Sequence, residues 1–138
     1  MKPLGYWLVH VHQLLEAVLD ATLRTESLTR RHWQALNTIA NGAGTQEGVE
    51  RAMAPFVTQG DLMNPLLDDF RHRGWLTTST DGTGFTLTED GRAAHVRTQN
   101  AVVAYRAMVT EGVSDEEYLT THRVLERVAA NLEAATRN

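Results

Sequence analysis

The sequence predicts a mainly α-helical fold that carries one small β-hairpin. Several segments place their apolar residues three and four positions apart, which is the spacing of one helical face. Residues 75–88 break this period, with two short β-prone runs on either side of a turn-rich tip. Cap residues and glycines mark the expected helix ends. A chain of 138 residues is long enough for one domain with its own core.

Residues 4–23 form the first predicted helix. Pro3 suits the first turn, where a missing N–H costs no hydrogen bond. A helix of this length is roughly 30 Å long. Its apolar face is wider than one small neighbouring element would cover, and it contains Leu4, Trp7, Leu8, Val11, Leu14, Leu15, Val18 and Leu19.

Two threonines mark the next helices. Thr29 is the expected N-cap of a helix over residues 30–40, and Thr45 caps a shorter one. In the shorter helix Val49, Met53 and Phe56 share a face, and Pro55 should end or kink it.

The fourth helix is expected at residues 65–73. Pro65 would cost a hydrogen bond if the helix began near Asp61, but none if Asn64 is the N-cap. Gly74 stands where a C-terminal glycine cap belongs.

After the hairpin, a long helix should run to about Val109. Ser114, with Glu117 three residues later, is a capping box for a last helix over about 115–135. Four helices, a hairpin and two more helices make a winged helix-turn-helix with long N- and C-terminal dimerisation helices. We expect the head at residues 29–92 and the dimerisation helices at 1–28 and 93–138, because their apolar faces need a second copy of the chain.

Composition narrows the function classes. Cysteine is absent, which excludes disulfides, thiolate metal sites and a cysteine nucleophile. The N-terminal segment has neither the pattern of a signal peptide nor that of a membrane span, so we expect a cytoplasmic protein. The net charge is −4, and residues 45–95 carry four Lys or Arg against eight Asp or Glu, which does not favour a nucleic-acid partner.

Four runs of residues resemble MarR-type transcriptional regulators over nearly the whole chain. They are Leu-Gly-Tyr-Trp-Leu at 4–8, the Leu-Thr…Trp…Leu pattern of 28–36, Phe-Arg-His-Arg-Gly-Trp-Leu at 70–76 and Leu-Thr-Glu-Asp-Gly-Arg at 87–92. The resemblance implies a homodimer joined through its first and last helices. It also implies that the fourth helix enters the major groove of double-stranded DNA, that the hairpin (the wing) reaches the minor groove, and that small, often aromatic ligands relieve repression.

The DNA-facing segments depart from the pattern of that family. The front of the fourth helix is Gly-Asp-Leu-Met-Asn-Pro at 60–65, where relatives are usually rich in Ser, Thr and Arg. Residues 74–91 contain no Lys or Arg, although family wings usually have a basic tip. Asp68 and Asp69 add negative charge beside the helix that should meet phosphate. We therefore expect weak DNA binding with a shallow salt dependence.

The candidate DNA contacts come from the fourth helix and the wing. Arg71 and Arg73 would bind phosphates, with Arg30, Arg31, Arg51 and Arg92 as further donors. Base edges would be contacted by Thr58, Gln59 and Asn64, and phosphates also by Ser79, Thr80 and Thr83. The alternative for Arg71 and Arg73 is that they only complement the dipole at a helix end.

A ligand site is expected on the first two helices, from Tyr6, Trp7, His10 and Trp33. The alternative is that Trp7 and Trp33 are core or dimer-interface anchors.

The six histidines lack metal-ligand spacing, so no metal site is predicted. No catalytic motif stands out, and we expect neither enzymatic activity nor a cofactor.

The sequence therefore predicts a dimeric, ligand-responsive, DNA-binding regulator. The alternative is a winged-helix dimer with little DNA affinity that acts as a protein-interaction or ligand-sensing module.

Overall fold

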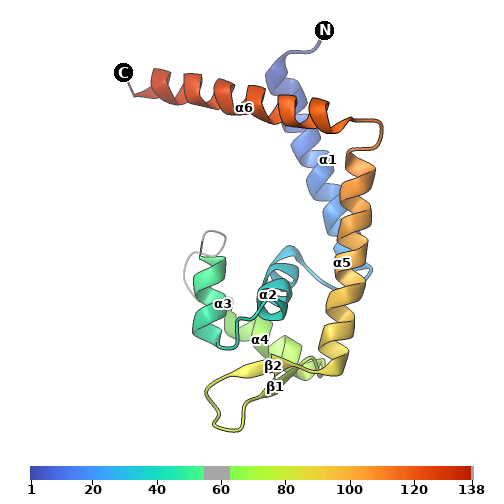
Figure 1. Cartoon of the computed structure of the whole chain (residues 1–138), viewed down its shortest axis with the longest axis vertical. Helices are drawn as coiled ribbons and strands as arrows, with labels where there is room; N and C mark the ends of the chain where they lie inside the picture. Colours follow the sequence, from blue (N-terminus) through green and yellow to red (C-terminus); the bar gives the residue numbers. More distant parts are fainter. Residues whose placement is uncertain (55–62, 138) are drawn as a thin grey trace. The chain divides into compact units, whose positions relative to one another are not determined.

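The computed structural model describes residues 1–54 and 63–137. The chain divides into two compact units, Met1–Tyr105 and Arg106–Asn138. Figure 1 shows the helices and the hairpin in the predicted order. The elements are α1 (Leu4–Arg24), α2 (Arg30–Ala40), α3 (Gln46–Met53), α4 (Met63–His72), β1 (Leu76–Thr78), β2 (Phe85–Leu87), α5 (Glu89–Val109) and α6 (Asp115–Thr136).

The start of α4 corrects the sequence prediction. The helix already includes Met63, so Asn64 is a helical residue and not the N-cap. Pro65 is then the third helical residue, and it is tolerated because the N–H groups of the first turn have no partner inside a helix. Pro55 and Phe56, expected near the end of α3, lie outside the described residues.

The predicted caps of three helices are confirmed. The Thr29 hydroxyl accepts a hydrogen bond from the backbone N–H of His32, and the Thr45 hydroxyl accepts one from Gly48. Ser114 and Glu117 form the predicted capping box at the start of α6. In each of these caps the donor and the acceptor are three residues apart in the chain, which is why the sequence alone identifies the cap.

The hydrophobic core lies in the head, between α2, α3, α4 and the hairpin. Leu36 of α2 and the α4 residues Leu67 and Phe70 are completely buried. Leu23 at the end of α1 belongs to the same core cluster. These contacts give α4 one buried face and leave Asp68, Arg71 and His72 exposed on the other.

The hairpin of β1 and β2 is antiparallel, with Leu76 paired to Leu87 and Thr78 to Phe85. The other edge of β2 is also bonded, because the Phe85 N–H donates to the Gly44 carbonyl oxygen at 2.8 Å. A Cβ on Gly84 would lie 2.5 Å from that oxygen, so only glycine allows so close an approach. The wing is therefore held against the loop between α2 and α3.

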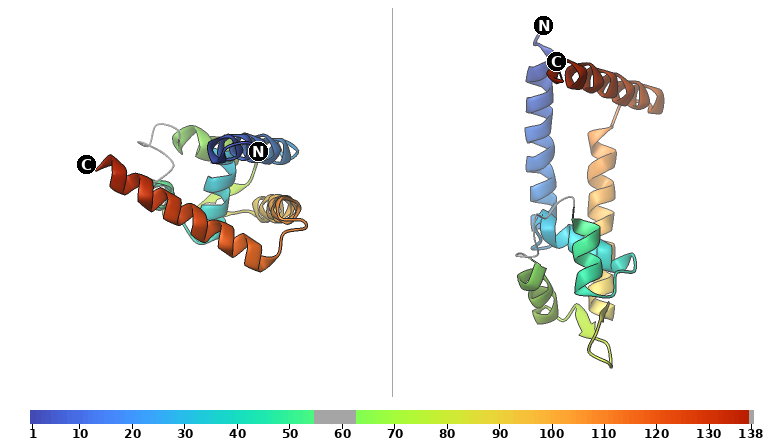
Figure 2. Two further views of the ribbon diagram at one scale, coloured as in Figure 1. Left: turned by 90° about the horizontal axis from the view of Figure 1, so that it is seen from above. Right: turned by 90° about the vertical axis from the view of Figure 1, so that its left-hand side faces the viewer.

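Within the first unit, α1 lies beside α5 (Figures 1 and 2). The Tyr105 hydroxyl donates to the Leu15 carbonyl oxygen at 3.1 Å, and the Arg97 Nε donates to Glu26. Of the residues of α1, only Leu23 is buried, so most of its apolar face stays uncovered. In the second unit, α6 buries no residue at all. None of the described helices combines the length and the apolar character that a membrane crossing requires.

Candidate nucleic-acid interface and ligand site

Arg73, which directly follows α4, makes three contacts. Its Nε donates to Asp69 Oδ2 at 2.9 Å, and its Nη2 donates to the Ser27 carbonyl oxygen at 2.9 Å. The guanidinium carbon lies 5.0 Å from the centre of the Trp75 ring. These contacts engage the Arg73 guanidinium within the fold. They favour a structural role for this residue at the end of α4 over phosphate binding.

Arg71 lies on the exposed face of α4. Its Nη1 is 3.1 Å from Asp68 Oδ1, one turn earlier on the same helix. The Asp68 side chain is 73% exposed, so this ion pair is readily exchanged for another partner. Of the two arginines, Arg71 has the more exposed side chain, at 41% against 24% for Arg73.

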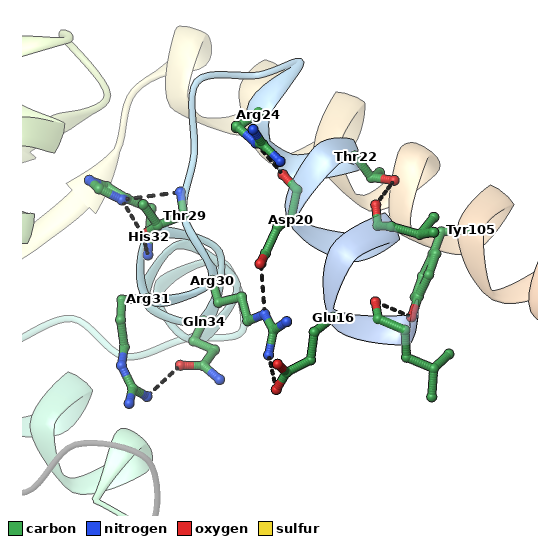
Figure 3. Close-up of polar contacts among 12 residues, drawn as sticks. Glu16, Asp20, Thr22, Arg24, Thr29, Arg30, Arg31, His32, Gln34 and Tyr105 are labelled. Atoms are coloured by element: carbon green, nitrogen blue, oxygen red, sulfur yellow. Dashed lines mark hydrogen bonds and ion pairs between the residues drawn. The ribbon is translucent and has the colours of Figure 1, made fainter. Parts of the chain in front are cut away.

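His32 connects the start of α2 to α4. Its Nε2 lies 3.0 Å from Asp69 Oδ2, and its Nδ1 lies 2.7 Å from the Thr29 hydroxyl oxygen (Figure 3 shows the contact with Thr29). Burial lowers the pKa of His32 below its ordinary value, and the charge of Arg73 acts in the same direction, whereas Asp69 opposes both. The neutral ring fits this geometry, because Nε2–H donates to the carboxylate while Nδ1 accepts from Thr29.

The tip of the wing is organised around a carboxylate. Thr80 and Thr83 are exposed there, as a contact with a DNA groove requires. Asp81 Oδ1 accepts from the Ser79 hydroxyl at 2.6 Å and from the Thr83 hydroxyl at 2.7 Å. These bonds lower the pKa of Asp81 to about 2. The tip is therefore negative at neutral pH, which opposes an approach to phosphate.

The candidate base contacts precede the buried part of α4. Thr58 and Gln59 lie outside the described residues, and of Asn64 only the helical backbone is described. Arg30, another candidate phosphate contact, instead ties α2 to α1 (Figure 3): its Nε donates to Asp20 Oδ1 at 2.9 Å and its Nη1 to Glu16 at 3.4 Å.

The four candidate ligand residues fall into two groups. Tyr6, Trp7 and His10 contact one another at the start of α1, with ring centres 5.3–6.3 Å apart. Trp33 instead stacks on His95 of α5, with ring centres 5.4 Å apart and planes 17° apart. Among the described residues, no aromatic contact joins Trp33 to the α1 group. Trp33 also packs against the core, as the alternative interpretation of this residue expects.

A cleft that sequence reasoning missed lies beside the wing. It has a volume of about 410 Å³ and is bordered by the end of α2, the loop before α3, strand β2 and the start of α5. Arg92 and His95 are its charged and titratable residues. Their spacing of three on one helix was the only signal in the sequence, and it indicates a shared face but not what lies opposite.

The described ranges, 1–54 and 63–137, contain no candidate metal site. No group of three or more His, Asp or Glu side chains there could hold an ion.

Known structures resemble the chain over nearly its full length, although no family model matches it. A MarR family protein of Mycobacterium tuberculosis, crystallised in complex with DNA, is 25% identical; the match covers 93% of this chain and 98% of that chain, with a TM-score of 0.70. The same protein in complex with p-aminosalicylic acid matches with a TM-score of 0.65, over 93% of this chain and 99% of that one.

Two further structures share the fold at lower identity. MarR from Escherichia coli is 20% identical, with 94% of this chain and 96% of that chain covered and a TM-score of 0.66. A protein of unknown function from Listeria innocua is 16% identical, with coverages of 92% and 91% and a TM-score of 0.73. The chain therefore has the winged helix-turn-helix fold of the MarR family, which consists of transcription regulators and not of enzymes.

Proposed function

We propose that the chain is a dimeric, DNA-binding transcription regulator of the cytoplasm that responds to a small aromatic ligand. The observation that carries this proposal is the match, over nearly both full chains, to a MarR family protein crystallised with DNA. The match of the same protein in complex with p-aminosalicylic acid supports the ligand response.

Dimerisation is supported by apolar surface that the single chain leaves open. Five large apolar residues on the first three turns of α1 are each 44–51% exposed: Leu4, Trp7, Leu8, Val11 and Leu14. On α6, four large apolar residues are 46–61% exposed: Tyr118, Leu119, Val124 and Leu132. Apolar surface on this scale favours a protein partner, and a second copy is the simplest one. We therefore propose residues 1–28 and 93–138 as the dimerisation helices and 29–92 as the DNA-binding head.

DNA contact is proposed through α4 in the major groove and the wing in the minor groove. Arg71 is the principal phosphate contact of α4, with Thr80 and Thr83 at the tip of the wing. Asp68, Asp69 and Asp81 lie on the same elements and repel phosphate, so the affinity is low and the dependence on salt is shallow.

A second candidate function is a winged-helix dimer that acts as a protein-interaction or ligand-sensing module with little DNA affinity. The specific observation in its favour is the ionised Asp81 at the tip of a wing without Lys or Arg. The engagement of Arg73 in the packing of α4 points the same way.

The deciding experiment begins with capture of genomic DNA fragments by the purified chain, and continues with fluorescence anisotropy on the enriched sequence. A regulator binds a defined operator, and Arg71→Gln weakens that binding while Lys2→Gln, a matched loss of one charge before the start of α1, does not. Sedimentation equilibrium should give twice the mass of the chain. If no genomic sequence is enriched at low salt, the first candidate is wrong and the second is favoured.

A further inference from the structure

Two adjacent aspartates of α4 lie in different surroundings. The side chain of Asp69 is 34% exposed, and its Oδ2 contacts both the Arg73 Nε and the His32 Nε2. The side chain of Asp68 is 73% exposed, and among the described residues its carboxylate has one hydrogen-bond partner, Arg71, which binds Oδ1. Asp69 is therefore used inside the fold, whereas Oδ2 of Asp68 is open to a donor from outside.

Asp68 lies on the outward face of α4. Its neighbours Leu67 and Phe70 are completely buried, so the helix turns position 68 away from the core. Of the α4 side chains that the structure describes, Asp68 is the exposed polar one nearest to the N-terminal end. Recognition helices contact base edges through their N-terminal part. In the proposed docking of α4, Asp68 is therefore the described side chain best placed to meet a base.

Arg71 lies against the Asp68 carboxylate and offsets its charge. The Arg71 Nη1 donates to Asp68 Oδ1 at 3.1 Å. The guanidinium carbon also lies 5.9 Å from the centre of the ring of Phe85, a buried residue of β2. The other guanidinium donors remain for phosphate, as the proposed function requires. Because of this cation, the carboxylate enters a groove of negative charge at a lower cost than an isolated one would.

The hydrogen-bonding pattern of the bases decides what Asp68 selects. An ionised carboxylate only accepts hydrogen bonds. In the major groove guanine presents two acceptors, N7 and O6, and thymine presents the O4 acceptor and a methyl group. Adenine offers its N6 donor beside the N7 acceptor, which repels a carboxylate, whereas cytosine offers its N4 donor without an acceptor of its own. Cytosine is therefore the base that an aspartate prefers at this position.

We propose that Asp68 is a specificity-determining residue that binds the N4 amino group of a cytosine in each half of the DNA site. The inference rests on the proposed function, because it requires α4 in the major groove. The charge of Asp68 lowers the affinity for every sequence that lacks a donor at this position, since the carboxylate then faces DNA without a partner. Asp68 thereby weakens binding to DNA in general and gains selectivity for one site.

Selection from a randomised DNA library with the full chain tests this assignment. The enriched site should contain one cytosine in each half whose replacement by any other base lowers the affinity by about tenfold or more. Asp68→Asn should shift the preference at that position to adenine, because an amide both accepts from N6 and donates to N7. Asp68→Ala should leave no base preference there. A change confined to this one position in each half supports the proposal.

Glu47→Gln is the matched control for the loss of charge. It removes one exposed carboxylate from α3, where the Arg51 Nη2 lies 3.9 Å from Glu47 Oε1. This substitution should change no base preference. Circular dichroism confirms that each variant is folded.

Two outcomes would overturn the proposal alone. One is tighter binding of Asp68→Asn and Asp68→Ala to all sequences with unchanged base preferences, which would mean that Asp68 only repels phosphate. The other is a change of preference at every position of the site, which would mean that the substitution displaces α4. Both leave the proposed regulator intact, since an operator is still selected. Enrichment of no sequence at all would refute the regulator and, with it, this inference.

Discussion

His32 and Asp69 join α2 to α4 through a contact of 3.0 Å between Nε2 and Oδ2. The same carboxylate oxygen accepts from the Arg73 Nε at 2.9 Å, and Arg73 in turn donates to the Ser27 carbonyl oxygen. Asp69 is therefore a junction between the turn after α1, the start of α2 and the end of α4. It sets the position of the helix proposed to contact the major groove.

Loss of the charge on Asp69 should destabilise the head. In Asp69→Asn the amide keeps the size of the side chain, and its oxygen can still accept from His32 and Arg73, but it carries no negative charge. We expect the free energy of unfolding to fall by about 1–2 kcal/mol, because charge-assisted hydrogen bonds are lost at a partly exposed site. Urea denaturation followed by circular dichroism measures this change.

Asp68→Asn is the matched control for that prediction. It removes one carboxylate from the adjacent position, where the partner Arg71 and Asp68 itself are both exposed. The change should stay within about 0.5 kcal/mol, as is usual for surface ion pairs. If the two substitutions lower the free energy of unfolding equally, Asp69 does not stabilise the contact between α2 and α4 as described.

The stability of the head should decrease in mild acid because of His32. Burial lowers the pKa of His32 in the folded state, so the unfolded chain takes up the proton more readily. The stabilising contribution is complete above about pH 6.5, the ordinary pKa of histidine, and is lost as the pH falls towards the lower folded value. Burial lowers the pKa of His95 too, and its effect has the same sign.

Denaturation curves between about pH 5 and 7 test this dependence. His32→Gln should flatten the decline in the free energy of unfolding, and a second substitution, His95→Gln, should flatten it further. An unaltered slope in the His32 variant would contradict the expectation.

Gly91 should tolerate no side chain. A Cβ at this buried position would overlap the carbonyl oxygen of Trp75 and lie 3.1 Å from Leu87 Cδ2. That oxygen already accepts from the Thr88 N–H, so it is not free to move. Gly91→Ala should lower the free energy of unfolding by about 1–3 kcal/mol, as overpacking does.

Gly5→Ala is the opposite case within α1. Nothing lies within 4 Å of a Cβ at Gly5, and alanine is the better helix former. Thermal melts should show an unchanged or higher midpoint for Gly5→Ala and a lower one for Gly91→Ala. A midpoint for Gly91→Ala equal to that of the unaltered chain would disprove the close packing of α5 on the wing.

A cation at the tip of the wing should strengthen DNA binding. Thr80 is exposed beside the ionised Asp81, so Thr80→Lys offsets a repulsive charge. Each added phosphate contact steepens the salt dependence of the binding constant by about 0.9 in the double-logarithmic slope. Anisotropy titrations at several salt concentrations should show this change for Thr80→Lys but not for the uncharged Thr80→Gln. Identical slopes for the two variants would mean that the wing does not reach the phosphates.

Helix order and helix caps were predictable because their causes are local. Thr29 caps α2 through an N–H three residues away, and Ser114 does the same for α6, so a short stretch of sequence contains the whole interaction. The start of α4 was predicted wrongly at Pro65. A proline is favoured at the first helical position but is tolerated throughout the first turn, so sequence alone does not fix where the helix begins.

The candidate site was less predictable because its contacts join distant segments. Arg73 was expected at phosphate, but it binds a carbonyl 46 residues earlier in the chain. His95 was one of six histidines to which the sequence assigned no site, and in the structure it stacks on Trp33 and lines the cleft beside the wing. Neither partner could be inferred from spacing, because neither is a neighbour in sequence.

The sequence by itself determined the order of the elements of this protein, the acidic character of its central segment and the apolar face of α1. Only the tertiary structure decided which charges are committed inside the fold and which remain open to a ligand. Arg73 directly follows α4 and Arg92 lies in the first turn of α5, yet one is bound by Asp69 and Ser27 and the other borders a cleft. The physical reason is that periodicity and capping depend on residues within one or two helical turns, whereas the availability of a charge depends on what folding brings next to it.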